Sequence, residues 1–131
     1  MLRFVAKPRV QRNADPSEAA VLTKAVTRVA ALLSLTQRQV GTALGLSGPT
    51  VSRLFAGKYV LSPTRAKEWE LGVLLVRLFR SLDAIWGHED TARTWLRTYN
   101  TALAAAPIDL LASASGLIRV VDYLDHARGR V

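Results

Sequence analysis

The sequence predicts an all-α protein made of short helices around a shared apolar core. Three observations carry this prediction. Apolar residues recur at intervals of three and four along several segments, and residues that cap helices stand at the starts of those segments. Nowhere in the 131 residues do apolar and polar side chains alternate over a strand-like stretch.

The composition is that of a folded protein without cysteine chemistry. Apolar residues make up 50% of the chain and charged residues 21%, which is ordinary for a folded domain. The absence of cysteine excludes disulfides and thiolate metal sites, and the distant His88 and His126 form no zinc-binding pair. No apolar run reaches the ~18 residues that span a membrane, and the first residues lack a secretory signal. We therefore expect a cytoplasmic protein without metal, cofactor or membrane partner.

The positive charge lies almost entirely in the first half of the chain. Of the net charge of +8, residues 1–60 contribute nine Lys or Arg against two acids, whereas residues 61–131 contribute nine against eight. A basic segment in front of a nearly neutral one indicates a polyanion, such as a nucleic acid, as the partner of the front half. A basic face that only keeps the protein in solution is the alternative.

A basic arm and a helix open the chain. Residues 1–14 contain Pro8 and lack helical periodicity, which predicts an arm without regular structure. Asp15 and Glu18 have the spacing of a capping box, with Pro16 at the first helical position. The helix that follows has one apolar face, formed by Leu22, Val26, Val29, Leu32 and Leu33.

Two short helices then meet at a glycine. Thr36 caps the first of them, and Gln39 stands three residues later to complete a capping box. Gly45 suits a turn with a positive φ, and Gly41 lets the second helix pack closely across the first. Ser47 caps this second helix. The remaining apolar positions form the buried side: Val40, Leu44, Leu46, Val51 and Leu54.

Glycines, caps and apolar positions in this order are typical of a helix-turn-helix, whose second helix enters the major groove of DNA with its amino-terminal end. Arg53 is the strongest candidate for a specific contact, because a guanidinium can pair bidentately with a guanine edge. Gln37 and Arg38 stand at the start of the preceding helix, where that helix crosses the DNA backbone, and we expect them to hold phosphates. Lys58 and Tyr59, just past the second helix, are further candidates for phosphate contacts. The candidate DNA-binding residues are Gln37, Arg38, Ser47, Gly48, Pro49, Thr50, Ser52, Arg53 and Lys58. A helical hairpin without a DNA role is the alternative.

The second half of the chain predicts a long helix and three shorter ones. The long helix is capped near Ser62, begins with Pro63 and ends at Gly87. It carries two apolar stripes, one of Leu71, Leu75, Leu78, Leu82 and Ile85 and the other of Trp69, Val73, Val76 and Phe79. A helix that is apolar on both sides lies in the centre of a core or at a subunit seam. Shorter helices are expected after Gly87, from Pro107, and from Gly116 onward.

Two family resemblances follow from these residues. Residues 17–60 are similar in spacing to the Xre/Cro repressor class, and residues 86–131 resemble the toxin-binding domain of Xre/MbcA/ParS-type antitoxins. The second resemblance rests on Trp86-Gly87, Trp95-Leu96, Pro107-x-Asp109-Leu110-Leu111, Gly116 and residues 120–124. From the residues themselves, we expect Trp95 and Leu96 in the core and Gly116 at a close bend into the last helix.

The resemblance implies an antitoxin of a type II toxin–antitoxin system, whose partner is a RES-domain toxin that degrades NAD. Such an antitoxin covers the entrance to the toxin's active site with its carboxyl-terminal region. It also represses its own operon by binding operator DNA, as a homodimer within a hetero-oligomeric complex. Carried onto this chain, the toxin-binding candidates are Tyr123, Asp125, His126, Arg128 and Arg130, all expected to be exposed. A frayed, solvated helix end is the alternative for Arg128 and Arg130.

The residues and the resemblance together imply a domain order, in which the basic arm is not a feature of the family. We expect a basic arm at 1–14, a helix-turn-helix region at 15–60, a linking or dimerising helix at 61–86 and a small helical toxin-binding domain at 87–131. The chain departs from the family at Tyr99-Asn100 and at residues 104–106, where the family often has a Pro-Asn step and a bend with glycine. This departure predicts a more helical connection.

Two other functions remain open, and catalysis is not expected. The chain could be a stand-alone transcription regulator whose second half only dimerises, or an inhibitor with a vestigial helix-turn-helix. The segment GLSGP lacks the final glycine of a G-x-S-x-G nucleophile motif, and no G-x-x-x-x-G-K-[ST] phosphate loop is present. The acidic pairs Glu68/Glu70 and Glu89/Asp90 fall where exposed helix faces carry charge.

Overall fold

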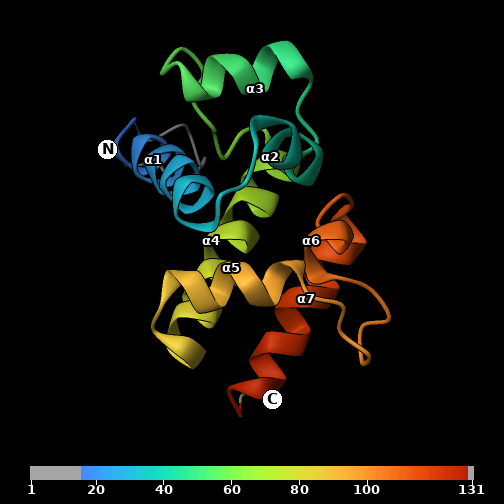
Figure 1. Ribbon diagram of the computed structural model, residues 1–131. Helices are drawn as coiled ribbons and strands as arrows, with labels where there is room; N and C mark the ends of the chain where they lie inside the picture. Colours follow the sequence, from blue (N-terminus) through green and yellow to red (C-terminus); the bar gives the residue numbers. More distant parts are fainter. Residues whose placement is uncertain (1–15, 130–131) are drawn as a thin grey trace, which may run out of the picture.

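Seven helices form the part of the chain that the computed structural model describes, residues 16–129 (Figure 1). They are α1 (Pro16–Leu33), α2 (Gln37–Leu44), α3 (Gly48–Phe55), α4 (Ala66–Trp86), α5 (Glu89–Arg97), α6 (Pro107–Leu110) and α7 (Ala114–Ala127). Within these residues, extended backbone pairs only at one isolated bridge between Asn100 and Ala105, so the predicted all-α fold is confirmed. None of the described helices is long and apolar enough to cross a membrane. The predicted arm, Asp15 and Arg130 lie outside the described residues.

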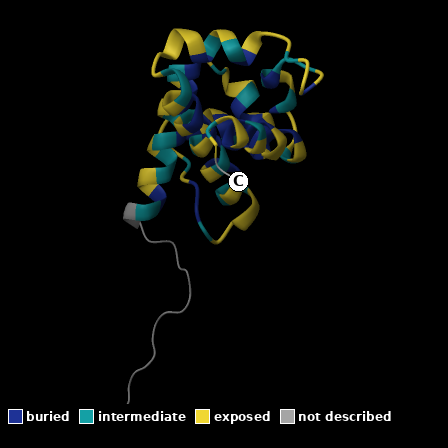
Figure 2. Ribbon diagram, turned by 90° about the horizontal axis from the view of Figure 1, so that it is seen from below, coloured by how far each residue is buried: buried dark blue, intermediate teal, exposed yellow. Residues whose placement is uncertain are grey.

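The central helix is α4, and helices from both halves of the chain pack against it. It contacts α1, α2, α5 and α7. Figure 1 shows α1–α3 around its first half and α5–α7 around its second. In Figure 2 the buried residues lie where the helices meet, and the exposed ones cover the outer faces. Both halves of the chain therefore share one core built on α4.

The structure distinguishes the two apolar stripes of α4. Leu71, Leu75, Leu78 and Leu82 are buried and form the core stripe. The other stripe is half-buried at Trp69, Val76 and Phe79, and Val73 is 44% exposed. The leucine stripe thus buries more apolar surface than the other stripe. Each Å² of apolar surface removed from water stabilises the folded state by about 25 cal/mol.

The caps predicted for α2 and α3 are present. Thr36 and Gln39 exchange hydrogen bonds, with the Thr36 amide donating to Gln39 Oε1 at 2.9 Å and the Gln39 amide to Thr36 Oγ1 at 3.0 Å. Gly45 takes a φ of 73° at the turn. A Cβ on Gly41 would lie 3.2 Å from both the Leu46 carbonyl oxygen and a methyl group of Val51, so a small residue is needed there. Local chemistry therefore sets the angle between these two helices.

The predicted start of the long helix is wrong, because α4 begins at Ala66 rather than at Pro63. Ser62 and Pro63 instead open a turn, in which the Arg65 amide donates to the Ser62 carbonyl at 3.0 Å. Ser at the first and Pro at the second position suit such a turn as well as they suit a helix start. The Leu61 amide donates to Thr23 Oγ1 of α1 at 2.9 Å. This long-range bond holds the segment between α3 and α4 against α1, so α4 begins only after it.

Two arginines of α5 join the two halves of the molecule. Arg93 donates to the Leu32 carbonyl at 2.8 Å, and Arg97 donates to the carbonyls of Leu33 and Ser34 at 3.0 and 2.8 Å. The last carbonyls of a helix have no partner within the helix, and they carry the negative end of its dipole. The arginines of α5 therefore satisfy the carboxyl-terminal end of α1 and fix α5 against it.

The connection from α5 to α6 is a tight turn, so the predicted helical connection is wrong. Asn100 and Ala105 exchange backbone hydrogen bonds of 3.0 and 3.3 Å, and Asn100 Oδ1 accepts from the Leu103 amide at 3.0 Å. Ala104 takes a φ of 58°, a conformation that favours glycine. The asparagine side chain therefore replaces a helical hydrogen bond and turns the chain.

Gly116 lies inside the first turn of α7, which begins at Ala114 with Ser113 as its cap. A Cβ on Gly116 would lie only 1.9 Å from the carbonyl oxygen of Leu110 at the end of α6. The predicted close approach at this glycine is therefore present. It occurs between helix backbones rather than at a bend before the helix.

Candidate functional site

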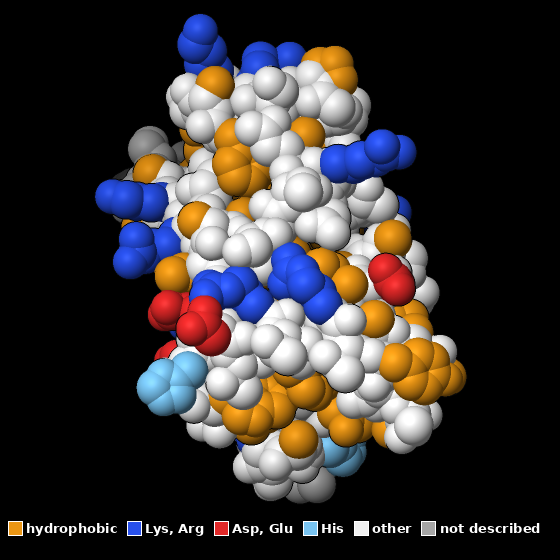
Figure 3. Space-filling view, in the orientation of Figure 1, with side chains coloured by type: hydrophobic (Ala, Val, Ile, Leu, Met, Phe, Trp, Pro, Cys, Tyr) orange, Lys and Arg blue, Asp and Glu red, His pale blue; other side chains and the backbone are white. Residues whose placement is uncertain are grey.

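The outer face of α3 is open to a ligand. Figure 1 shows α3 at the edge of the molecule, beyond α1 and α2. Val51 and Leu54 on its inner face are buried, whereas Pro49, Ser52 and Arg53 are exposed. In Figure 3, Lys and Arg side chains project from this end of the molecule. The helix can therefore reach a groove of DNA without any rearrangement of the bundle.

The start of α3 is held by its own side chains. Ser47 Oγ accepts from the Thr50 amide at 3.2 Å and donates to Thr50 Oγ1 at 2.9 Å. Gly48 between them is exposed, with no atom within 4 Å of the position of a Cβ. Ser47 and Thr50 thus stabilise the end of the helix that faces outward, while Ser52 forms no such bond within residues 16–129.

The candidate phosphate contacts flank α3 on two sides. Gln37 and Arg38 are exposed at the start of α2, and they line a groove between α2 and α3 together with Gly48. Lys58 is exposed just beyond α3, and its amide donates to the Arg53 carbonyl at 2.8 Å. Exposed candidate residues therefore stand on α2 and just beyond α3, with the exposed helix between them. A helix-turn-helix uses such a surface to hold the DNA backbone.

Tyr59 lies at the centre of a charged cluster behind the end of α3. Its hydroxyl donates to Glu68, and Arg65 Nε donates to the same carboxylate oxygen at 2.9 Å. The guanidinium carbons of Arg65 and Arg53 lie 4.9 and 6.0 Å from the centre of the Tyr59 ring. Burial and the hydrogen bond to Glu68 raise the pKa of the Tyr59 phenol above its ordinary value, so the hydroxyl remains a donor well above neutral pH. Tyr59 thus makes its contacts within the protein, and its contact with a phosphate stays a prediction.

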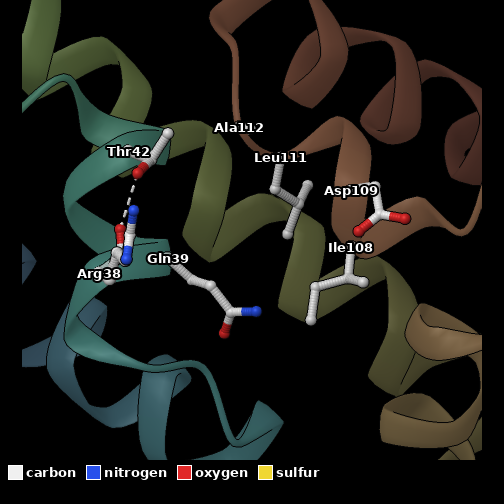
Figure 4. A pocket seen from close by; sticks show the side chains of 7 residues that line it. All are labelled: Arg38, Gln39, Thr42, Ile108, Asp109, Leu111 and Ala112. Atoms are coloured by element: carbon white, nitrogen blue, oxygen red, sulfur yellow. Dashed lines mark hydrogen bonds between the residues drawn. The ribbon is translucent and has the colours of Figure 1, made fainter.

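A second groove lies between α2 and α6, where the two halves of the chain meet. Figure 4 shows Arg38, Gln39 and Thr42 on one side and Ile108, Asp109, Leu111 and Ala112 on the other. Its volume is about 200 Å³, and Asp109 is the one carboxylate that lines it. A single acid offers no acid–base pair for catalysis. Among residues 16–129, no three His, Asp or Glu side chains gather as a metal site.

The last helix anchors two of the residues predicted to be exposed. Asp125 is 8% exposed and forms an ion pair with Arg77 of α4. Ser81 Oγ donates to Asp125 Oδ1 at 3.4 Å and accepts from Arg128 Nη1 at 2.9 Å. The predicted exposure of Asp125 is therefore wrong, because it packs against α4, where Arg77 compensates its charge. Arg128 is half-buried and fixed to α4 rather than frayed.

The other candidates on α7 differ in their exposure. Tyr123 is half-buried, with its ring centre 6.0 Å from that of Trp95, which lies 5.5 Å from Trp86. His126 is exposed, and its Nδ1 lies 2.9 Å from the Asp122 carbonyl oxygen. Leu96 is fully buried, as predicted, but Trp95 is only half-buried. The aromatic cluster therefore offers part of its surface to solvent beside His126.

Sequence reasoning missed the partners that hold these side chains. Arg77 is the one charged residue between Leu71 and Phe79, and this isolation was a signal of an ion pair with a neighbouring helix. Nothing in the sequence indicated which of the eight acids in residues 61–131 would pair with it. Nothing in the sequence indicated that Glu68 would accept a hydrogen bond from Tyr59, because the turn that begins at Ser62 brings the two residues together.

Two family models match the chain. Residues 13–77 match the antitoxin Xre-like helix-turn-helix domain, and residues 81–130 match the antitoxin Xre/MbcA/ParS C-terminal toxin-binding domain. No curated protein matches the chain. The first match contains α3 and the cluster around Tyr59, and the second contains the aromatic cluster and Asp125. Both resemblances predicted from the sequence are therefore confirmed.

Proposed function

We propose that the chain neutralises a RES-domain toxin and represses its own operon. This proposal starts from its family, because the chain belongs to the antitoxins that join an Xre-like helix-turn-helix domain to an Xre/MbcA/ParS toxin-binding domain. The toxin degrades NAD, and the antitoxin blocks the entrance to its active site. Residues 15–60 bind DNA, residues 61–86 link the two regions and support a homodimer, and residues 87–131 bind the toxin.

The observation that carries this proposal is the exposed α3 on a chain that also holds a toxin-binding domain. Operator binding rests on Arg53 and Ser52 at base edges. Phosphate contacts come from Gln37, Arg38 and Lys58, all of which are exposed. Ser47, Gly48, Pro49 and Thr50 form the amino-terminal end of α3 that approaches the groove.

On the opposite side of the molecule, the toxin surface consists of the last helix and the residues that follow it. His126 and the half-buried Tyr123 are available to a partner. Asp125 and Arg128 act indirectly, because their contacts with Arg77 and Ser81 fix the end of α7. Arg130 belongs to the proposed surface by its place in the sequence.

Expression together with the neighbouring reading frame tests the toxin partner. The neighbour alone should arrest growth and lower cellular NAD, whereas co-expression with this chain should restore both and yield a complex that co-purifies. The variant Arg53→Ala is the matched control, because its toxin surface is intact and it should protect equally well. A neighbour that is harmless alone would contradict the proposal and favour a stand-alone regulator.

Replacing Arg53 by alanine should weaken operator binding by roughly 1–3 kcal/mol and relax the preference at one base pair. Arg53 is exposed on the outer face of α3, and the contact within the protein that is lost with it is the one with the Tyr59 ring. Binding is measured by fluorescence anisotropy on the operator, on single-base variants of it and on random DNA.

Lys58→Ala is the control for this measurement. It should weaken binding to operator and random DNA by similar factors and lower the salt slope by about one unit, as expected for a phosphate contact. If Arg53→Ala also weakened both DNAs equally, Arg53 would be a backbone contact and its assigned role would be wrong.

A further inference from the structure

We propose that Tyr59 is a positioning residue, which holds the guanidinium of Arg53 in the orientation in which it reads a base. This inference rests on the proposed function, because it deepens the role of α3 in operator binding. Arg53 lies in the last turn of α3, and Tyr59 follows in the segment that leads to α4. Their contact therefore joins the DNA-facing helix to the scaffold behind it.

The ring is the group that restrains Arg53. The guanidinium carbon lies 6.0 Å from the ring centre, within the distance at which an aromatic face attracts a cation. Among residues 16–129, Arg53 forms no ion pair that could hold its side chain in another direction. An exposed arginine without such a contact would lose the freedom of several rotatable bonds when it met a base. The ring reduces that loss before DNA arrives.

The orientation of the Tyr59 ring is itself fixed by α4 and its cap. Its hydroxyl donates to Glu68, whose carboxylate also accepts from Arg65 at 2.9 Å. Arg65 in turn lies 4.9 Å from the ring centre and donates to the Val60 carbonyl. Tyr59 is thus held at its hydroxyl and at its face by residues of one rigid helix end. A site supported by such a shell keeps its geometry better than one placed on a loop alone.

The charges of the cluster leave Arg53 available to DNA. Glu68 pairs with Arg65, so the carboxylate of the cluster is already compensated. Arg53 is the cation that contacts the ring without sharing Glu68, and it is exposed. Lys58 is also exposed, and among residues 16–129 the cations that lie over the ring are Arg53 and Arg65. The cluster therefore orients Arg53 for reading a base, which contributes to the preference for one DNA sequence. Lys58 contributes affinity for any duplex.

A double-mutant cycle tests the inference. The full-length chain is made with Tyr59→Leu, Tyr59→Phe, Arg53→Ala and the combination of Tyr59→Leu with Arg53→Ala. The measured quantity is the ratio of affinities for operator and random DNA, at a temperature where circular dichroism shows every variant to be folded. Using this ratio separates base reading from a general loss of structure, which would weaken both DNAs.

Tyr59→Leu should lower the ratio about two- to fivefold, because the attraction between cation and ring is lost. Tyr59→Phe loses the bond to Glu68 but keeps the ring, which Arg65 still covers, and should stay within about twofold of the parent chain. In the Arg53→Ala background, Tyr59→Leu should have no further effect on the ratio. Equal losses in both backgrounds would overturn the inference, and so would an unchanged ratio in Tyr59→Leu alone.

The same cycle separates this inference from the proposed function. If Arg53→Ala lowers the ratio and Tyr59→Leu does not, only the positioning role of Tyr59 is wrong. If Arg53→Ala leaves the ratio unchanged, base reading by Arg53 is wrong, and the role of Tyr59 fails with it.

Discussion

Replacing Gly116 by alanine should destabilise the protein by about 3–5 kcal/mol and abolish neutralisation of the toxin. The added Cβ would stand 1.9 Å from the carbonyl oxygen of Leu110, which is a backbone atom that cannot rotate away. Either α6 or the first turn of α7 must therefore move. Because α7 packs along α4, this movement displaces the surface that carries His126 and Tyr123.

The measurement is chemical denaturation of the chain alone, followed by co-purification with the toxin. Gly48→Ala is the matched control, since Gly48 also lies in the first turn of a helix but has no atom within 4 Å of the Cβ position. That variant should be as stable as the parent chain or up to ~1 kcal/mol more stable, because alanine favours helix. Equal stabilities of the two variants would contradict the close approach of α6 to α7.

Local capping chemistry explains why the first half of the fold could be predicted well. Thr36 with Gln39, and Ser47 with Thr50, form their hydrogen bonds within four residues, so their sequence spacing alone specifies them. The start of α4 could not be predicted in this way. A Ser-Pro pair fits both a helix start and a turn, and only the bond from Leu61 to Thr23, far away in the sequence, decides between them.

The candidate sites show the same limit. The exposed face of α3 follows from helical periodicity, so Arg53 and Ser52 could be chosen from the sequence. The burial of Asp125 could not be predicted, because an aspartate is ordinarily exposed unless it is paired. Its environment depends on Arg77, which comes from another helix. Residues held by distant partners need the packing of the helices before their role can be assigned.

Replacing Leu75 by aspartate should leave the chain largely unfolded. Leu75 is fully buried in the centre of α4, where both halves of the molecule pack. Loss of a buried leucine side chain alone costs about 2–5 kcal/mol, and a carboxylate without a partner adds a desolvation penalty. Proteins are stable by only about 5–15 kcal/mol, so little of this stability would remain. Circular dichroism and thermal unfolding measure the effect.

Val73→Asp is the control that separates the two stripes of α4. Val73 is 44% exposed, so an aspartate there keeps its hydration and the chain should fold with a change in stability below about 1 kcal/mol. If the half-buried stripe with Trp69 and Val76 joins two copies of the chain, this variant should sediment as a monomer while the parent chain is a dimer. A folded Leu75→Asp variant would show instead that the leucine stripe faces water, and the arrangement of both halves around α4 would be wrong.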